Sequence, residues 1–157
     1  MKYIIAIIII VAIGGFIYTQ RSAPSPIVYE PYALLCSGEF DYFSPGETDC
    51  FSITKEGKAF ASTSVTLGLK YFGEISTTTN FSEVADLVDA VAKEVEVQAV
   101  SILEHDEYII HTKIGKILIK GSDLEMEESN ILVFLRERKM DKFEYIDARH
   151  GNSIFFK

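Results

Sequence analysis

The sequence has few of the residues that usually carry chemistry. Only two of its 157 residues are cysteines and only three are histidines. A structural zinc site needs about four Cys or His ligands, and no such residues cluster in the sequence near Cys36 and Cys50. The sequence motifs of serine hydrolases, zinc proteases, P-loop proteins and dinucleotide-binding enzymes are also missing. We therefore predict no catalytic site, no metal site and no cofactor, and hence no enzyme activity.

Positively charged residues are also scarce. The chain has 15 Lys and Arg against 23 Asp and Glu, which gives a net charge of −8, and no basic patch stands out. Because nucleic-acid binding depends on Lys and Arg contacts to phosphates, we predict that the protein does not bind nucleic acid. Acidic residues, in turn, are missing before Glu30. This asymmetry separates an apolar N-terminal segment from an acidic domain that faces solvent.

The histidines and one charged pair are expected to be ordinary surface features. His105, His111 and His150 are isolated from one another in predicted turns or at strand ends, and we predict that all three are exposed and chemically inert. Asp147 and Arg149 are two residues apart on one predicted strand, so their side chains share a face. We expect them to form a structural ion pair.

The longest apolar run covers residues 3–18 and has a tyrosine at each end. As a helix with a rise of about 1.5 Å per residue it would span roughly 24 Å, slightly less than a hydrocarbon core of about 30 Å. Lys2 and Arg21 would lie at the two membrane surfaces. We predict a single-pass anchor over residues 1–19 that contacts the lipid bilayer, with a cytoplasmic N-terminus and an extracytoplasmic C-terminal domain. A cleaved signal peptide is the alternative, although a cleavage site is hard to find.

Prolines are confined to the segment that follows. Residues 20–49 contain every proline of the chain, namely Pro24, Pro26, Pro31 and Pro45. This composition predicts a semi-extended extracytoplasmic stalk. The folded domain is then expected to cover residues 50–157.

Hydrophobic periodicity in this domain predicts several strands and two helices. Amphipathic helices are expected over residues 81–93 and 123–138, and Asn80 with Glu83 forms a capping-box pattern before the first. The predicted fold class is α+β, with one N-terminal transmembrane helix followed by a small domain with a mainly antiparallel sheet and two helices. Strand patterns before the closing segment cover residues 51–54, 58–61, 65–71, 97–104, 107–112 and 116–120.

The closing segment, residues 143–157, predicts a β-hairpin. It reads Phe-Glu-Tyr-Ile-Asp-Ala-Arg, then His-Gly-Asn, then Ser-Ile-Phe-Phe-Lys, and Gly-Asn is a turn signal between two arms rich in aromatic and β-branched residues. This ending resembles the end of the extracytoplasmic β domain of FtsQ and DivIB, bitopic cell-division proteins of bacteria. That ending typically reads Tyr-Ile-Asp-Leu-Arg, a short turn, and an apolar strand that closes on a basic residue. Ala148 stands where the family usually has Leu.

The resemblance, which extends in element order over residues 50–157, implies a role in septum formation. It implies a non-enzymatic, membrane-anchored divisome scaffold at the division septum. Its partners would be small bitopic coiled-coil proteins of the FtsB/DivIC and FtsL type. FtsQ and DivIB usually carry a POTRA domain where this chain has residues 20–49, a segment too short to hold one. The alternative is a secreted or anchored cell-surface binding module unrelated to division.

The final strand is the predicted binding site. On a strand, Ile154 and Phe156 point to one face, and Ser153, Phe155 and Lys157 to the other. If one face packs on the helices, an aromatic side chain remains on the far face, which favours an exposed edge that pairs with a partner strand. The last strand of FtsQ and DivIB likewise receives the partner. The alternative is a strand buried on both faces. The predicted partner-binding residues are Arg149, Asn152, Ser153, Ile154, Phe155, Phe156 and Lys157.

The two cysteines are expected to form a disulfide. Their number is even, and an extracytoplasmic domain lies in an oxidising compartment. A bond between Cys36 and Cys50 would tie the stalk to the first strand of the domain. The alternative is two unpaired thiols, with Cys50 simply buried.

Overall fold

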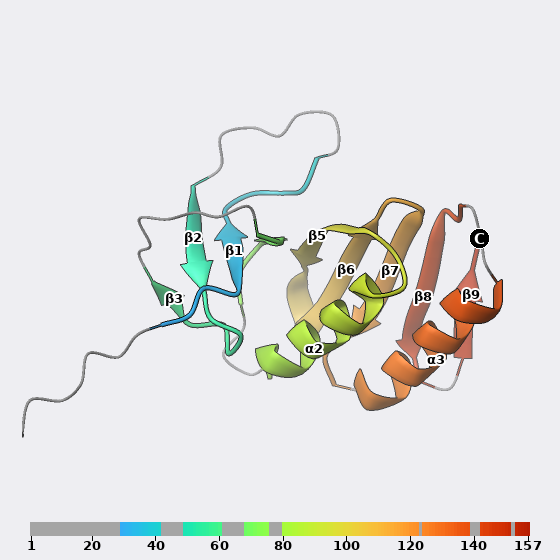
Figure 1. Cartoon of the computed structure of the whole chain (residues 1–157). Helices are drawn as coiled ribbons and strands as arrows, with labels where there is room; N and C mark the ends of the chain where they lie inside the picture. The colour runs from blue at the N-terminus through green and yellow to red at the C-terminus, as the bar shows by residue number, and fades with distance from the viewer. Residues whose placement is uncertain are drawn as a thin grey trace, which may run out of the picture.

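The described part of the chain forms a single sheet with two α-helices on one face (Figure 1). The structure is a computed structural model, and it describes residues 29–41, 49–60, 68–75, 80–122, 124–138, 142–151 and 153–157. Within these ranges the sheet has nine strands in the order β3-β2-β1-β4-β5-β6-β7-β8-β9. Neighbours β1–β4, β4–β5 and β7–β8 are parallel, and the other pairs are antiparallel. The strands are β1 (Ala33–Cys36), β2 (Cys50–Ile53), β3 (Ala59–Phe60), β4 (Lys70–Phe72), β5 (Val97–Ile102), β6 (Glu107–Thr112), β7 (Gly115–Lys120), β8 (Tyr145–His150) and β9 (Ser153–Phe156).

Two helices, α2 (Phe81–Ala92) and α3 (Leu124–Arg138), lie next to each other over the sheet (Figure 1). A short 3-10 helix, η1 (Glu104–Asp106), joins β5 to β6. The core fills the space between the helices and the sheet. Because each fully buried Val, Leu or Ile contributes about 1.5–3 kcal/mol, this layer supplies most of the stability. Its fully buried members from α2 and the central strands include Val84, Leu87, Val88, Ile110, Ile117, Ile119 and Ile146.

The start of α2 differs in detail from the predicted capping box. Asn80 is the N-cap residue, but its side chain makes no hydrogen bond to the helix backbone. The side-chain oxygen of Asn80 accepts a hydrogen bond from Ser82 Oγ at 2.8 Å, and its side-chain NH2 group donates one to Glu83 Oε1 at 2.5 Å. Because both ends of the Asn80 side chain are engaged with side chains, the reciprocal backbone bonds of a capping box do not form.

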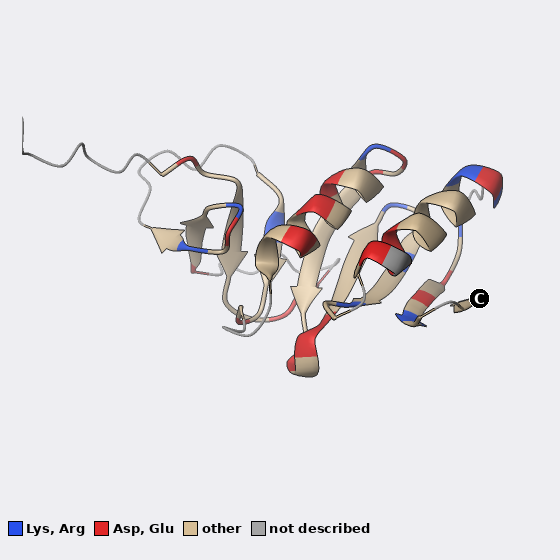
Figure 2. Ribbon diagram, turned by 90° about the horizontal axis from the view of Figure 1, so that it is seen from below, with Lys and Arg blue, Asp and Glu red and all other residues tan. Residues whose placement is uncertain are grey.

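The predicted fold class needs one correction, because it included a transmembrane helix. Among the described residues, no helix is both long and apolar enough to cross a bilayer. A spanning helix needs about 20 apolar residues, whereas α2 and α3 have 12 and 15 residues. Figure 2 shows acidic residues along the outer surface of α2. The fold described is therefore an α+β domain with a mainly antiparallel sheet and two helices; residues 3–18 lie outside the described residues.

The sheet takes in a segment that the sequence predicted to be stalk. β1 lies inside residues 20–49, yet it occupies an interior position between β2 and β4. The reason is that Ala33 packs in the core under the helices while Leu34 packs on the other face of the sheet. A short strand buried on both faces lacks the polar alternation that marks a half-exposed strand. The predicted strand over residues 65–71 lies partly outside the described residues, and β4 forms at its end.

Candidate partner-binding edge

Among the described strands, β9 lies at one edge of the sheet and pairs only with β8. Lys157 and Tyr145 form a hydrogen-bonded pair, with N···O distances of 3.1 and 3.4 Å in the two directions. In an antiparallel ladder such pairs alternate with pairs that do not exchange hydrogen bonds. Phe156, opposite Ile146, therefore turns its backbone N–H and C=O away from β8. These two groups therefore point away from all the other described strands.

Both aromatic side chains of β9 are exposed, on opposite faces of the sheet. Phe156 is 43% exposed and lies on the helix side, where its ring centroid is 5.0 Å from that of Phe134 in α3. Phe155 is 55% exposed and lies on the helix-free side, edge-on to the His150 ring at 5.4 Å. An edge strand with exposed aromatic residues and outward backbone groups is a template for pairing with another strand. Ile154 packs partly against the core.

The turn between β8 and β9 contains Gly151 in the left-handed region, with φ of +65°. A side chain there would meet no atom within 4 Å, so backbone conformation, and not space, favours glycine. Asn152, one of the predicted binding residues, lies outside the described residues. The ladder shifts register between Asp147 and His150, which marks an irregularity next to the turn.

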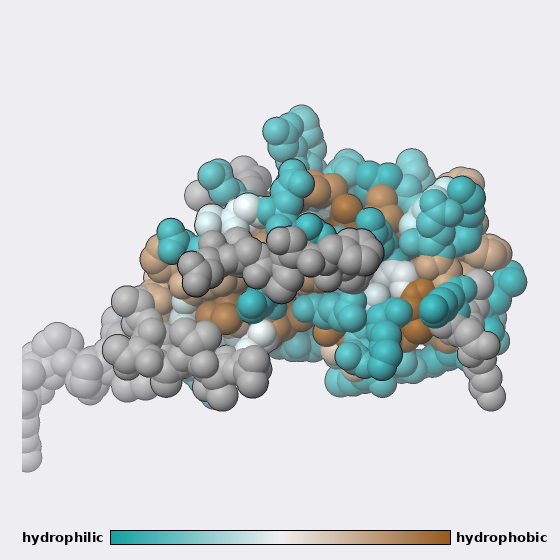
Figure 3. Space-filling view, turned by 90° about the horizontal axis from the view of Figure 1, so that it is seen from above, coloured by the Kyte–Doolittle hydropathy of each residue, from teal (hydrophilic) through white to brown (hydrophobic). Residues whose placement is uncertain are grey.

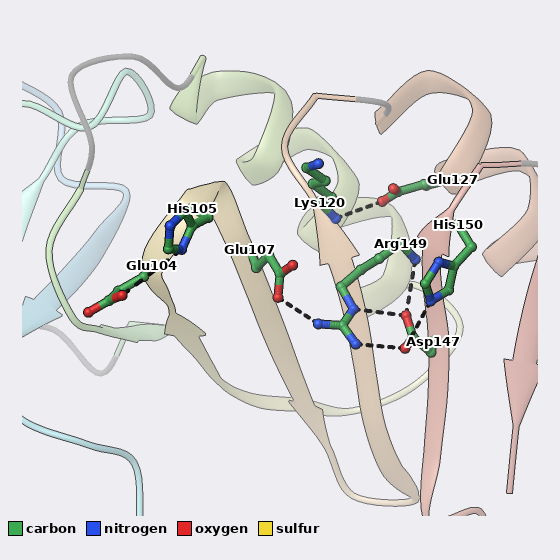
Figure 4. A network of polar contacts seen from close by, with 8 residues as sticks. All are labelled: Glu104, His105, Glu107, Lys120, Glu127, Asp147, Arg149 and His150. Atoms are coloured by element: carbon green, nitrogen blue, oxygen red, sulfur yellow. Dashed lines mark hydrogen bonds and ion pairs between the residues drawn. The ribbon is translucent and has the colours of Figure 1, made fainter.

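A charged network beside this hairpin connects β8 to β6 across β7 (Figure 4). Arg149 donates from Nε and from a terminal nitrogen to the two carboxylate oxygens of Asp147, at 2.9 and 2.7 Å. Its other terminal nitrogen donates to Glu107 at 2.5 Å. The side-chain hydrogen bonds from Arg149 to Asp147 lower the pKa of Asp147 below its usual value. The predicted pair of Asp147 and Arg149 is therefore present, and this geometry favours a structural role for Arg149 over partner contact.

We predict that Arg149→Met lowers the free energy of unfolding at pH 7 by about 1–2 kcal/mol, because it removes the guanidinium that donates to two partly buried carboxylates. A lowered carboxyl pKa contributes stability above the unfolded pKa and loses it as pH falls. The deficit should therefore shrink as the pH falls through the ordinary pKa of a carboxyl group and below it, where Asp147 becomes protonated. Urea titrations of wild type, Arg149→Met and Arg149→Lys across this range test it. An unchanged stability at pH 7 with reduced partner affinity would instead assign Arg149 to recognition.

One histidine is not at the surface, contrary to the prediction. His111 is 5% exposed, whereas the His105 and His150 side chains are 86% and 58% exposed. Its Nε2 lies 2.8 Å from Ser101 Oγ, and the Phe40 ring covers it with a centroid distance of 4.6 Å. Burial, and then the nearby Lys116 charge, lower the pKa of His111 to about 4. A base of this pKa under an aromatic ring is poorly suited to activate Ser101 on a substrate.

Cys36 and Cys50 form a disulfide between directly opposite residues of β1 and β2. The bond lies on the helix-free side of the sheet, where Cys36 packs in a small apolar cluster with Leu34 and Phe72. Within the described ranges, no group of three or more His, Cys, Asp or Glu side chains is arranged to hold a metal ion. The disulfide is therefore a link inside the sheet, between two of its strands.

No known protein family matches the sequence, and no curated protein matches it. The resemblance to FtsQ and DivIB therefore stays a prediction. Two further residues at the edge were not predicted from the sequence. Phe134 and Arg138, one helical turn apart on α3, both contact Phe156. The only signal for them was an aromatic residue and an arginine four positions apart on the helix surface.

Proposed function

We propose that this domain is a non-enzymatic scaffold that binds an extended segment of a partner protein through β9. The observation that carries the proposal is the edge position of β9, with the backbone N–H and C=O of Phe156 turned outward. A partner strand added there would gain main-chain hydrogen bonds from the edge and specificity from side-chain contacts on the two faces. Phe155 and Phe156 supply one exposed aromatic contact on each face.

We further propose that the scaffold acts in bacterial cell division, at the septum and outside the cytoplasm. The support is the resemblance of residues 143–157 to the end of FtsQ and DivIB. The disulfide between Cys36 and Cys50 supports an oxidising compartment, because disulfides rarely persist in the cytosol. The proposed partners are small bitopic coiled-coil proteins of the FtsB/DivIC and FtsL type, which would supply the added strand.

The first test uses two substitutions at one residue. Phe156→Ala removes the side chain, whereas Phe156→Pro also removes the outward N–H. We expect Phe156→Pro to bind the extracytoplasmic segment of an FtsB/DivIC-type protein at least about tenfold more weakly than Phe156→Ala, since a main-chain donor is lost and the proline ring blocks the edge. Isothermal titration calorimetry measures both affinities.

The two variants should melt within a few degrees of each other, because the lost donor takes no part in the β8–β9 ladder. Equal affinities for Phe156→Ala and Phe156→Pro would show that the edge is not used. A fluorescent fusion of the protein in dividing cells then separates the division role from a general surface module. A band at midcell supports division, and a uniform envelope signal contradicts it.

A further inference from the structure

A cavity of about 460 Å³ lies where the loop after α2, the β6–β7 turn and the last turns of α3 meet. Half of its lining residues are apolar, and Phe143, 8% exposed, packs over Gly115 at one side of it. A volume of this size accommodates one or two large side chains. The residues that line it are Glu94, Val95, Glu96, Lys113, Ile114, Phe134, Leu135, Arg136, Arg138 and Phe143.

Most charges at the mouth of this cavity are already engaged with one another. Arg136 binds Glu94 at 2.7 Å, and Lys113 binds Glu96 at 3.2 Å. Arg138 is arranged differently, because its guanidinium lies over the ring of Phe134 at 5.6 Å and over that of Phe156 at 4.8 Å. A cation held on aromatic rings keeps its N–H groups at the ring edges for a carboxylate. Figure 2 shows the basic residues at this end of α3.

The cavity is continuous with the end of β9. Phe134 and Arg138 line the cavity and also contact Phe156. The backbone N–H of Glu144, next to Phe143 in the cavity wall, donates to the Lys157 carbonyl at 2.6 Å. A segment paired with β9 therefore reaches the mouth of the cavity once it passes Lys157. On the surface seen in Figure 3, hydrophobic residues form small patches between hydrophilic ones.

We propose that the segment that pairs with β9 carries an apolar anchor that fills this cavity, with a carboxylate beside it that binds Arg138. This inference rests on the proposed function. An added strand antiparallel to β9, the more stable arrangement, has its N-terminal end next to Lys157. The anchor and the carboxylate therefore precede the paired residues in the partner sequence. The partner is a strand with an acidic and apolar extension at its N-terminal side.

Fluorescein-labelled synthetic peptides test this directly. The first is a six-residue strand of alternating Val and Thr, and the second adds an N-terminal extension with one Phe and one Glu. In a third the same extension is moved to the C-terminal end, and in two more the Phe becomes Ser or the Glu becomes Gln. We expect the N-terminal extension to tighten binding about tenfold or more by fluorescence anisotropy, because it buries an aromatic side chain. The C-terminal extension should give no comparable gain.

Protein variants assign the gain to the cavity. Val95→Phe, which fills the cavity, should remove the advantage of the Phe extension while the plain strand binds as before. Arg138→Gln should bind the Glu and Gln peptides equally, and Lys142→Gln removes an equal charge outside the cavity as the matched control. Melting temperatures verify that each variant is folded.

The outcomes distinguish the two proposals. If the plain strand binds and the N-terminal extension adds nothing, the cavity is not the anchor site, while edge pairing stands. If the extended peptide binds equally to wild type and Phe156→Pro, the cavity and the edge do not act together, which also overturns this inference. If neither the peptides nor the FtsB/DivIC-type segment binds, the proposed function fails and this inference fails with it.

Discussion

Reduction of the bond between Cys36 and Cys50 should lower the free energy of unfolding by about 3 kcal/mol. The two residues are 14 apart in sequence, and a closed loop of this length removes about that much chain entropy from the unfolded state in the loop-closure model. Equilibrium unfolding in guanidinium chloride, with and without a phosphine reductant, measures the difference. The Cys36→Ala, Cys50→Ala double variant should show the lower stability and no further response to reductant.

The loss of stability on reduction should be greatest at one end of the sheet. Among the described strands, β2 and β3 join the rest of the sheet only through β1, and the disulfide ties β1 to β2. Amide hydrogen exchange in β2 and β3 should therefore accelerate on reduction more than exchange in β6 and β7, because weakly connected elements open at lower free energy. A change in unfolding free energy below about 1 kcal/mol would contradict the prediction.

Local patterns were sufficient for the elements whose burial is one-sided. The apolar stripe of Val84, Leu87, Val88 and Val91 predicted the position and inner face of α2, and all four are buried. The turn residues around Gly151 likewise predicted the β8–β9 hairpin. In both cases the signal comes from residues a few positions apart, which a single sequence displays directly.

The features that were not predicted from the sequence depend on contacts between residues far apart in the chain. β1 is held in the sheet by antiparallel pairing with β2 and parallel pairing with β4. The four residues of β1 do not indicate either of these partners. His111 lies on β6, whose range was predicted, but its burial depends on Phe40, which comes much earlier in the chain. The contact of Arg138 with Phe156 depends on how α3 crosses the edge strand. Such packing relations have no periodic signature.

The buried histidine leads to the second large effect, a loss of stability in mild acid. Burial and the Lys116 charge lower the pKa of His111 from 6.5 to about 4. Below about pH 6.5 the unfolded chain binds a proton at this residue that the folded chain does not bind until about pH 4. The contribution of His111 to stability is therefore unaffected above pH 6.5, falls between pH 6.5 and pH 4, and levels off below. At about 1.4 kcal/mol per pH unit, the loss reaches about 2–3 kcal/mol at pH 4.

Other groups also titrate in this range, so the effect must be read as a difference from His111→Gln, which keeps a side-chain partner for Ser101 Oγ without titrating. Urea unfolding at half-unit steps from pH 7.5 to pH 4 gives both stability curves. The wild-type curve should fall relative to the variant by about 2–3 kcal/mol, with most of the change below pH 6.5. Because Phe40 covers the imidazole, Phe40→Ala should admit water, raise the pKa of His111 toward its ordinary value and flatten the difference. Parallel curves for wild type and His111→Gln would mean that the folded protein accepts the proton as readily as the unfolded chain.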